Sequence, residues 1–142
     1  KGNIYFLDTW EKRASPEFAL RKALYFAIKY SVDLVRLENN QGGEIWAFLW
    51  DRIVEDSGLD EDRIPGFEMV KATSGTGGKI ERASQLLVDY ELGRVWHVIN
   101  PQNTYLDLEA SLMRFPKRKP LDLVDSCWWS WSFLKGASSW LI

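Results

Sequence analysis

Short strand-like stretches alternate with longer amphipathic stretches along almost the whole chain. We expect strands at 4–7, 32–37, 67–72 and 94–98, and helices at 15–30, 43–55, 79–92, 104–115 and from about 121 onward. Chains that alternate in this way form an α/β fold, in which right-handed crossovers join the strands of one sheet. The sequence therefore predicts an α/β fold, and its 142 residues suit a single domain covering 1–142.

Local signals define several helix ends. Ser15-Pro16-Glu17 combines a capping hydroxyl, a proline in the first turn and a carboxylate that the helix dipole favours. Gly93 closes the helix at 79–92, and Thr104 with Asp107 resembles a capping box. The residues expected on the inner faces of the first two helices are Leu20, Leu24, Ala27, Ile28, Ile45, Phe48, Leu49 and Ile53, with Trp46 and Trp50 widening the second face.

The composition excludes several classes of protein. A net charge of −2 argues against a generally basic coat for nucleic acid, but it leaves room for a local basic patch. The single cysteine, Cys127, excludes an internal disulfide and a cysteine-rich zinc site. The apolar stretch at 121–142 carries Asp122, Asp125 and Lys135, which makes it a poor membrane span. We expect a reducing, cytoplasmic setting and no membrane partner.

A carboxylate stands at a favourable place after the strand expected at 32–37. Glu38 ends this strand and is followed by an Asn-Asn-Gln-Gly-Gly turn and a helix. In open α/β sheets, ligands bind just beyond the carboxyl ends of the strands. Glu38 is therefore a candidate site residue, and the alternative is a strand-end carboxylate that faces solvent.

The glycine-rich stretch at 74–79 is similar to a phosphate-binding P-loop but departs from it at two positions. A P-loop needs glycine where this chain has Thr73, and serine or threonine where it has Ile80. We interpret the stretch as a flexible connection between a strand and a helix. Lys79 and Arg82, one helical turn apart, either present charge to a phosphate or form a solvated face.

The stretch at 114–125 has the strongest charge pattern. Its basic residues are Arg114, Lys117, Arg118 and Lys119. Asp122 and Asp125 follow at a helix start, and their i, i+3 spacing puts both on one face. Carboxylates beside cations suit a site that holds Mg²⁺ or Mn²⁺ against a phosphodiester, because the metal needs oxygen ligands and the phosphate needs positive charge. The alternative is an acidic first turn that neutralises the helix dipole, after an exposed basic loop.

Together these stretches resemble the nuclease domain of the large terminase subunit of tailed bacteriophages, which has an RNase H-like fold. The matching stretches occur in the family's order along nearly the whole chain: GNIYFLD, RASPEF, VRLENNQGG, KIERASQLLVDYELGRVWHV and FPKRKPLDLVDS. The expected fold is accordingly an RNase H-like mixed sheet flanked by helices.

The resemblance implies a viral DNA-packaging enzyme, a phage or prophage protein of a bacterial host, that cuts double-stranded DNA with two Mg²⁺ or Mn²⁺ ions. Glu38 and Asp122 would be catalytic metal ligands, with Asp125 as a neighbouring acid and a further candidate ligand. The residues expected near DNA are Lys79, Arg82, Lys117, Arg118 and Lys119. Expected protein partners are the terminase ATPase portion, the small terminase and the portal protein.

The chain departs from the family pattern in three ways. Leu121-Asp122 stands where the family often has two adjacent aspartates. The ATPase half is absent, and so are the first two strands of the fold, one of which carries the first catalytic aspartate. One repair would move the strand at 4–7 beside the strand ending at Glu38 and bring Asp8 into the site. Another would pair open strand edges in a homodimer.

The departures leave two further interpretations open. In one, the chain is a catalytically inactive remnant that binds nucleic acid or protein through its basic loop and its tryptophan-rich last helix. In the other, it is an α/β protein with unrelated small-molecule chemistry.

Overall fold

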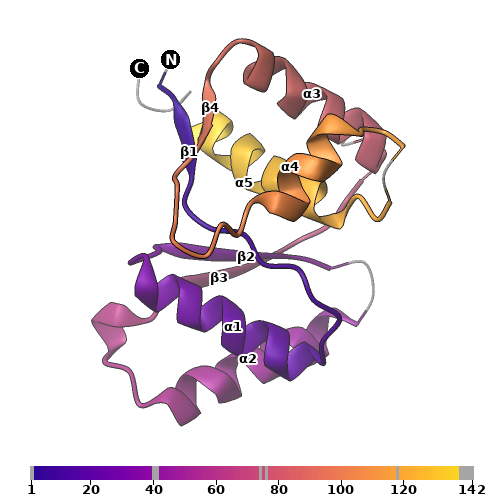
Figure 1. Cartoon of the computed structure of the whole chain (residues 1–142). Coiled ribbons are helices and arrows are strands. Elements are labelled where there is room, and N and C mark those ends of the chain that lie inside the picture. Colours follow the sequence, from indigo (N-terminus) through magenta and orange to yellow (C-terminus); the bar gives the residue numbers. More distant parts are fainter. Residues whose placement is uncertain (1, 40–41, 74, 76, 118, 138–142) are drawn as a thin grey trace. The chain divides into compact units, whose positions relative to one another are not determined.

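The computed structural model describes residues 2–39, 42–73, 75, 77–117 and 119–137. Helices alternate with short parallel strands through these residues, which confirms the α/β class (Figure 1). The chain divides into two compact units. Unit 1 contains the described residues of 1–11 and 74–142, and unit 2 contains those of 12–73.

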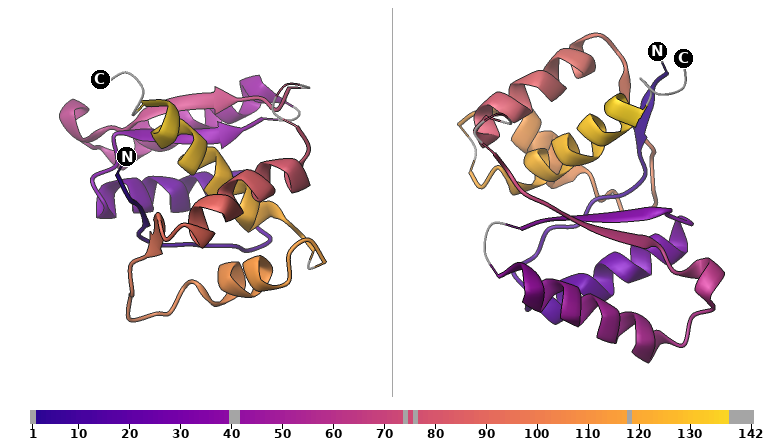
Figure 2. Two further views of the ribbon diagram at one scale, coloured as in Figure 1. Left: turned by 90° about the horizontal axis from the view of Figure 1, so that it is seen from above. Right: turned by 180° about the vertical axis from the view of Figure 1, so that it is seen from behind.

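Unit 2 is a two-stranded parallel sheet with two helices. Its elements are α1 (Pro16–Lys29), β2 (Leu34–Glu38), α2 (Gly43–Ser57), the 3₁₀ turn η1 (Glu61–Arg63) and β3 (Gly66–Val70). The strands pair in register from Leu34 opposite Gly66 to Glu38 opposite Val70. Both helices lie on the same face of this sheet (Figures 1 and 2). The strand bounds make Glu38 the last residue of β2, as predicted.

The core of unit 2 is apolar. Its buried members are Leu20, Leu24, Trp50 and Ile53. The ring of Trp50 stacks on that of Phe67, with centroids 4.7 Å apart, and so joins α2 to β3. The predicted inner face of α2 was partly wrong, because Ile45 and Phe48 are 65% and 66% exposed. The helix has an unbroken apolar run at 45–50, and the face with the large ring of Trp50 is the one that packs.

The predicted start of α1 is confirmed. The Ser15 hydroxyl accepts a hydrogen bond from the Phe18 amide at 3.2 Å, and Pro16 occupies the first turn. Leu20, Leu24 and Ala27 are buried as expected, whereas Ile28 is exposed. The buried stripe of this helix is therefore one residue narrower than the sequence pattern indicated.

Unit 1 contains the second parallel strand pair and three helices. Its elements are β1 (Ile4–Phe6), α3 (Lys79–Glu91), β4 (Val95–His97), α4 (Leu106–Met113) and α5 (Asp122–Ala137). The strand β1 pairs with β4, from Ile4 opposite Val95 to Phe6 opposite His97. The hypothesis that this strand would pair with β2 is therefore wrong, since the two belong to different sheets. β4 pairs with one edge of β1 over three residues.

The core of unit 1 gathers apolar side chains from every one of its helices. Its buried members are Ala83, Leu86, Val95, Tyr105, Leu108, Leu123, Val124, Cys127, Trp128 and Trp131. Cys127 is a core residue, as expected, and burial raises the pKa of its thiol to about 12. None of the described helices is long and apolar enough to cross a membrane.

The predicted capping box at Thr104 is wrong. The helix α4 begins at Leu106, and Tyr105 occupies the cap position. The Thr104 hydroxyl instead accepts a hydrogen bond from the Asn100 side-chain amide at 2.7 Å. The Tyr105 hydroxyl donates to the carbonyl oxygen of Phe6 at 2.6 Å, so this turn is tied to β1.

Candidate functional site

Polar contacts join α3 to α5 along their whole length. Four of these contacts pair a residue of α3 with one that lies 42 or 43 positions later in α5. The pairs are Lys79 with Asp122, Arg82 with Asp125, Gln85 with Trp128, and Asp89 with Trp131. Because the order is the same on both helices, α3 and α5 run in the same direction. Their N-terminal turns therefore lie side by side.

Arg82 and Asp125 form a buried, two-pronged ion pair between these helices. The Arg82 Nε and Nη2 atoms donate to the two carboxylate oxygens of Asp125, each at 2.7 Å. A third donor, Nη1, reaches the carbonyl oxygen of Gly77 at 2.8 Å. Both side chains are only 3% exposed. Paired planar geometry of this kind is among the strongest forms of charged hydrogen bonding.

Lys79 and Asp122 form a second ion pair one turn earlier, and this pair is open to solvent. Their side chains are 40% and 61% exposed. Lys79 and Arg82 lie in the first turn of α3, where positive charge opposes the helix dipole. Asp122 and Asp125 lie in the first turn of α5, where negative charge is favoured by the dipole of that helix. The pairing across the two helices offsets the unfavourable placement in α3.

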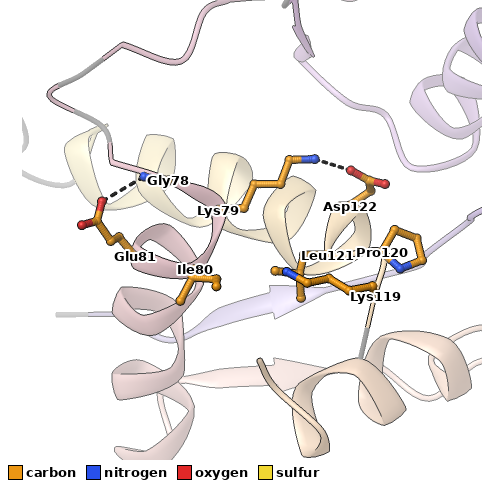
Figure 3. Close-up of a pocket in the computed structure, with 8 residues that line it drawn as sticks. All are labelled: Gly78, Lys79, Ile80, Glu81, Lys119, Pro120, Leu121 and Asp122. Atoms are coloured by element: carbon orange, nitrogen blue, oxygen red, sulfur yellow. Dashed lines mark hydrogen bonds and ion pairs between the residues drawn. The ribbon is translucent and has the colours of Figure 1, made fainter. Parts of the chain in front are cut away.

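A cavity of about 600 Å³ opens where the two helices begin (Figure 3). It is lined by Gly78, Lys79, Ile80, Glu81, Lys119, Pro120, Leu121 and Asp122. Lys79 reaches across to Asp122, while Glu81 turns back and accepts a hydrogen bond from the Gly78 amide at 2.9 Å (Figure 3). The cavity therefore presents two exposed carboxylates, Glu81 and Asp122, and two lysines.

A second cavity, also of about 600 Å³, adjoins the first through Lys119. Its lining consists of Met113, Arg114, Phe115, Lys117 and Lys119. No acidic residue lines this cavity among the residues the structure describes. Arg118, which was expected near DNA, lies outside the described residues. The basic stretch therefore places three cations around a hollow, which is a suitable shape and charge for an anion.

The four predicted acidic site residues are divided between the two units. Asp122 is exposed and paired with Lys79, and Asp125 has both oxygens on Arg82. Glu38 belongs to unit 2, whereas Asp8 follows β1 in unit 1 and accepts a hydrogen bond from the Thr9 amide. Within the described parts of the chain, no group of three or more His, Cys, Asp or Glu residues could hold a metal ion. Within unit 1, the partners of Asp122 and Asp125 are cationic side chains, Lys79 and Arg82.

A buried carboxylate near the far end of the same helices was not predicted. Asp89 is 3% exposed and accepts hydrogen bonds from Trp131 at 2.8 Å and Lys135 at 2.6 Å. Burial alone would raise the pKa of Asp89, but these hydrogen bonds and the charges of Lys135 and Arg94 outweigh burial and lower it. The sequence held one signal: Asp89 is three residues after Leu86, on the inner face of α3.

The single histidine belongs to another network that was not predicted. His97 lies between Tyr90, whose hydroxyl is 2.7 Å from Nε2, and Glu109, whose carboxylate is 3.0 Å from Nδ1. Its ring stacks on Tyr105 with centroids 4.6 Å apart. Burial raises the pKa of the Tyr90 phenol, which keeps this group protonated. The network joins α3, β4 and α4.

The cavity at the start of α3 and α5, with the adjoining one lined by residues after α4, is thus the best candidate site in unit 1. Exposed cations surround them, and a buried ion pair supports the backbone beneath. Comparisons of the chain with protein-family models, with curated proteins and with solved structures found no match.

Proposed function

We propose that this chain is a nuclease-type domain of a viral DNA-packaging terminase large subunit, with an RNase H-like fold and double-stranded DNA as its substrate. One observation carries the proposal: two adjoining cavities collect Lys79, Arg114, Lys117 and Lys119 beside the exposed carboxylate of Asp122. Cations spaced along a hollow match the phosphates of a DNA backbone. A carboxylate among them is where a cutting site would need one.

The position of Glu38 supports the same proposal. Glu38 ends β2, which is the edge where α/β sheets bind ligands.

The metal requirement is only partly met by these residues. The resemblance assigns metal ligation to Asp122 in unit 1 and to Glu38 in unit 2, whereas Asp125 is occupied by Arg82. An RNase H-like site needs one more acid than the described residues offer. Cleavage by this chain therefore requires a carboxylate from a further segment or from a partner, and DNA binding does not.

A plasmid-nicking assay with Mn²⁺ tests the cutting function. Where the wild type nicks, with the further carboxylate supplied by a second copy or another segment, we expect Glu38→Ala and Asp122→Ala to abolish nicking, because each removes a proposed ligand. Asp51→Ala is the matched control, since it removes an exposed carboxylate from α2. Equal nicking by all four proteins would contradict the nuclease proposal and point to a contaminating enzyme.

The second candidate is a non-catalytic module that binds DNA without cutting it. The buried ion pair between Arg82 and Asp125 favours this candidate, because it occupies one of the acids proposed as a metal ligand. Fluorescence anisotropy with a labelled DNA duplex separates the two candidates. Binding without nicking at any Mn²⁺ concentration supports the module, whereas absence of both binding and nicking excludes both candidates.

A further inference from the structure

The Arg82–Asp125 pair has a different exposure and geometry from the Lys79–Asp122 pair beside it. Arg82 uses three of its donors on two segments, Asp125 in α5 and the carbonyl of Gly77 before α3. To reach a phosphate, Arg82 would have to give up these bonds and leave the Asp125 carboxylate buried without its charge partner. That exchange is costly, because an isolated buried charge is strongly unfavourable.

The segments that Arg82 joins are those that carry the cavity wall. Gly77 precedes Gly78 and Lys79 on one side of the cavity, and Asp125 follows Leu121 and Asp122 on the other. The backbone amide of Asp125 also donates to the carbonyl oxygen of Leu121 at 2.9 Å. One guanidinium group thus connects both walls.

Two aromatic rings lie near the Arg82 guanidinium group. Its carbon lies 5.5 Å from the ring centroids of both Trp128 and Trp129. Cation–π contacts of this kind gain strength when the cation is removed from water. The tryptophan-rich stretch of α5 therefore encloses Arg82 rather than leaving it open to a ligand.

From this geometry we infer that Arg82 and Asp125 are a positioning pair: they contact neither DNA nor metal, and they hold the starts of α3 and α5 at the spacing that lets Lys79 and Lys119 bind one DNA backbone. The inference rests on the proposed DNA binding. It also removes Arg82 and Asp125 from the DNA-binding and metal-binding residues that the sequence pattern suggested.

Salt titration of DNA binding separates a positioning residue from a phosphate contact. Loss of one phosphate contact lowers the slope of log K against log salt by about 0.9. We expect Arg82→Lys to weaken binding about tenfold with an unchanged slope, because lysine keeps the charge but cannot replace the paired geometry. Lys119→Ala should lower the slope by about 0.9. Arg21→Lys, in an exposed pair of unit 2, is the matched control and should change neither quantity.

A rescue experiment tests the pair itself. Arg82→Met should lower the Tm and the DNA affinity, because it strands the Asp125 carboxylate in the core. Adding Asp125→Leu removes that stranded charge and should restore most of both, since apolar groups of similar volume often replace a buried ion pair without loss. A phosphate contact would not be restored by a change at Asp125.

Three results would overturn the inference. The first is an Arg82→Lys protein that binds DNA as tightly as the wild type, and the second is a slope that falls by about 0.9 in Arg82→Met. The third is a double variant with no recovery of Tm or affinity. A wild-type protein that binds no duplex even at low salt would instead contradict the proposed function, and the inference would fall with it.

Discussion

The two units of this protein use charge in opposite ways. Unit 1 buries the Arg82–Asp125 pair and the Asp89 carboxylate among its helices. Unit 2 pairs Arg21 and Arg36 with carboxylates that are about half exposed, and its buried core residues are apolar apart from the tryptophan indole. The difference teaches that similar helix-rich units can depend on different forces. Both units have an apolar core, and unit 1 additionally requires its buried charges to be matched.

Physical reasons make the first arrangement the more sensitive one. Burying two charges costs hydration free energy that their attraction roughly repays, so an intact pair adds little net stability. Removing one partner leaves the other charge buried, with its hydration lost and no attraction to compensate for that loss. A surface pair has little to lose, because water already solvates both groups. Single charge changes should therefore separate the two units.

The largest effect is expected for Asp125→Ala. The substitution leaves the Arg82 guanidinium buried without its carboxylate, and we expect a loss of about 3–5 kcal/mol in the free energy of unfolding. Urea unfolding gives the total, and hydrogen exchange of amides in α3 and α5 locates it. Faster exchange confined to α1 and α2 would contradict the assignment of this pair to the core of unit 1.

Ile53→Ala is the corresponding change in unit 2. The Ile53 side chain is only 2% exposed and lies with Leu20, Leu24 and Trp50 in the apolar core. Removing its buried methyl and methylene groups should cost about 2–5 kcal/mol. Ile45→Ala is the control on the same helix, and its exposed side chain should cost far less. Equal losses for the two variants would show that Ile45 packs in solution.

Acid should act on unit 1 through Asp89. The pKa of Asp89 is lowered in the folded state, so its contribution to stability is fully present above the ordinary value of 3.8 and is lost as the pH falls through the lowered folded-state pKa. We expect the urea midpoint of the wild type to fall more steeply below about pH 4 than that of Asp89→Asn. Asp51→Asn in α2 serves as the control. Parallel curves for wild type and Asp89→Asn would refute the role of Asp89.

The elements of this fold could be predicted from sequence better than the partners of their side chains. The start of α1 followed from Ser15, Pro16 and Glu17, which lie within one turn and act locally. The pairing of Arg82 with Asp125 joins residues 43 positions apart, and nothing local specifies it. The matching i, i+3 spacing on both helices fits a shared metal and phosphate site as well as a ladder of ion pairs.

The inner face of α2 shows a second limit of sequence analysis. Nearly every turn of this helix carries large apolar residues, so hydrophobic periodicity gives no unique face. The choice between Phe48 and Trp50 is made by Phe67 in β3, against which the tryptophan stacks. The placement of Lys79 and Arg82 at the start of α3 held a usable signal, because cations there oppose the helix dipole and need acidic partners.

The smallest effect is expected for Arg36→Gln in unit 2. Arg36 lies directly opposite Glu68 across β2 and β3, and its Nε donates to the Glu68 carboxylate at 2.8 Å. Glu68 is about half exposed, so water takes over when the pair is broken, and we expect a loss of about 0.2–1 kcal/mol in urea unfolding. The pair resembles Arg82–Asp125 in chemistry and differs from it in burial. A loss comparable to that of Asp125→Ala would therefore show that burial does not set the difference between the two units.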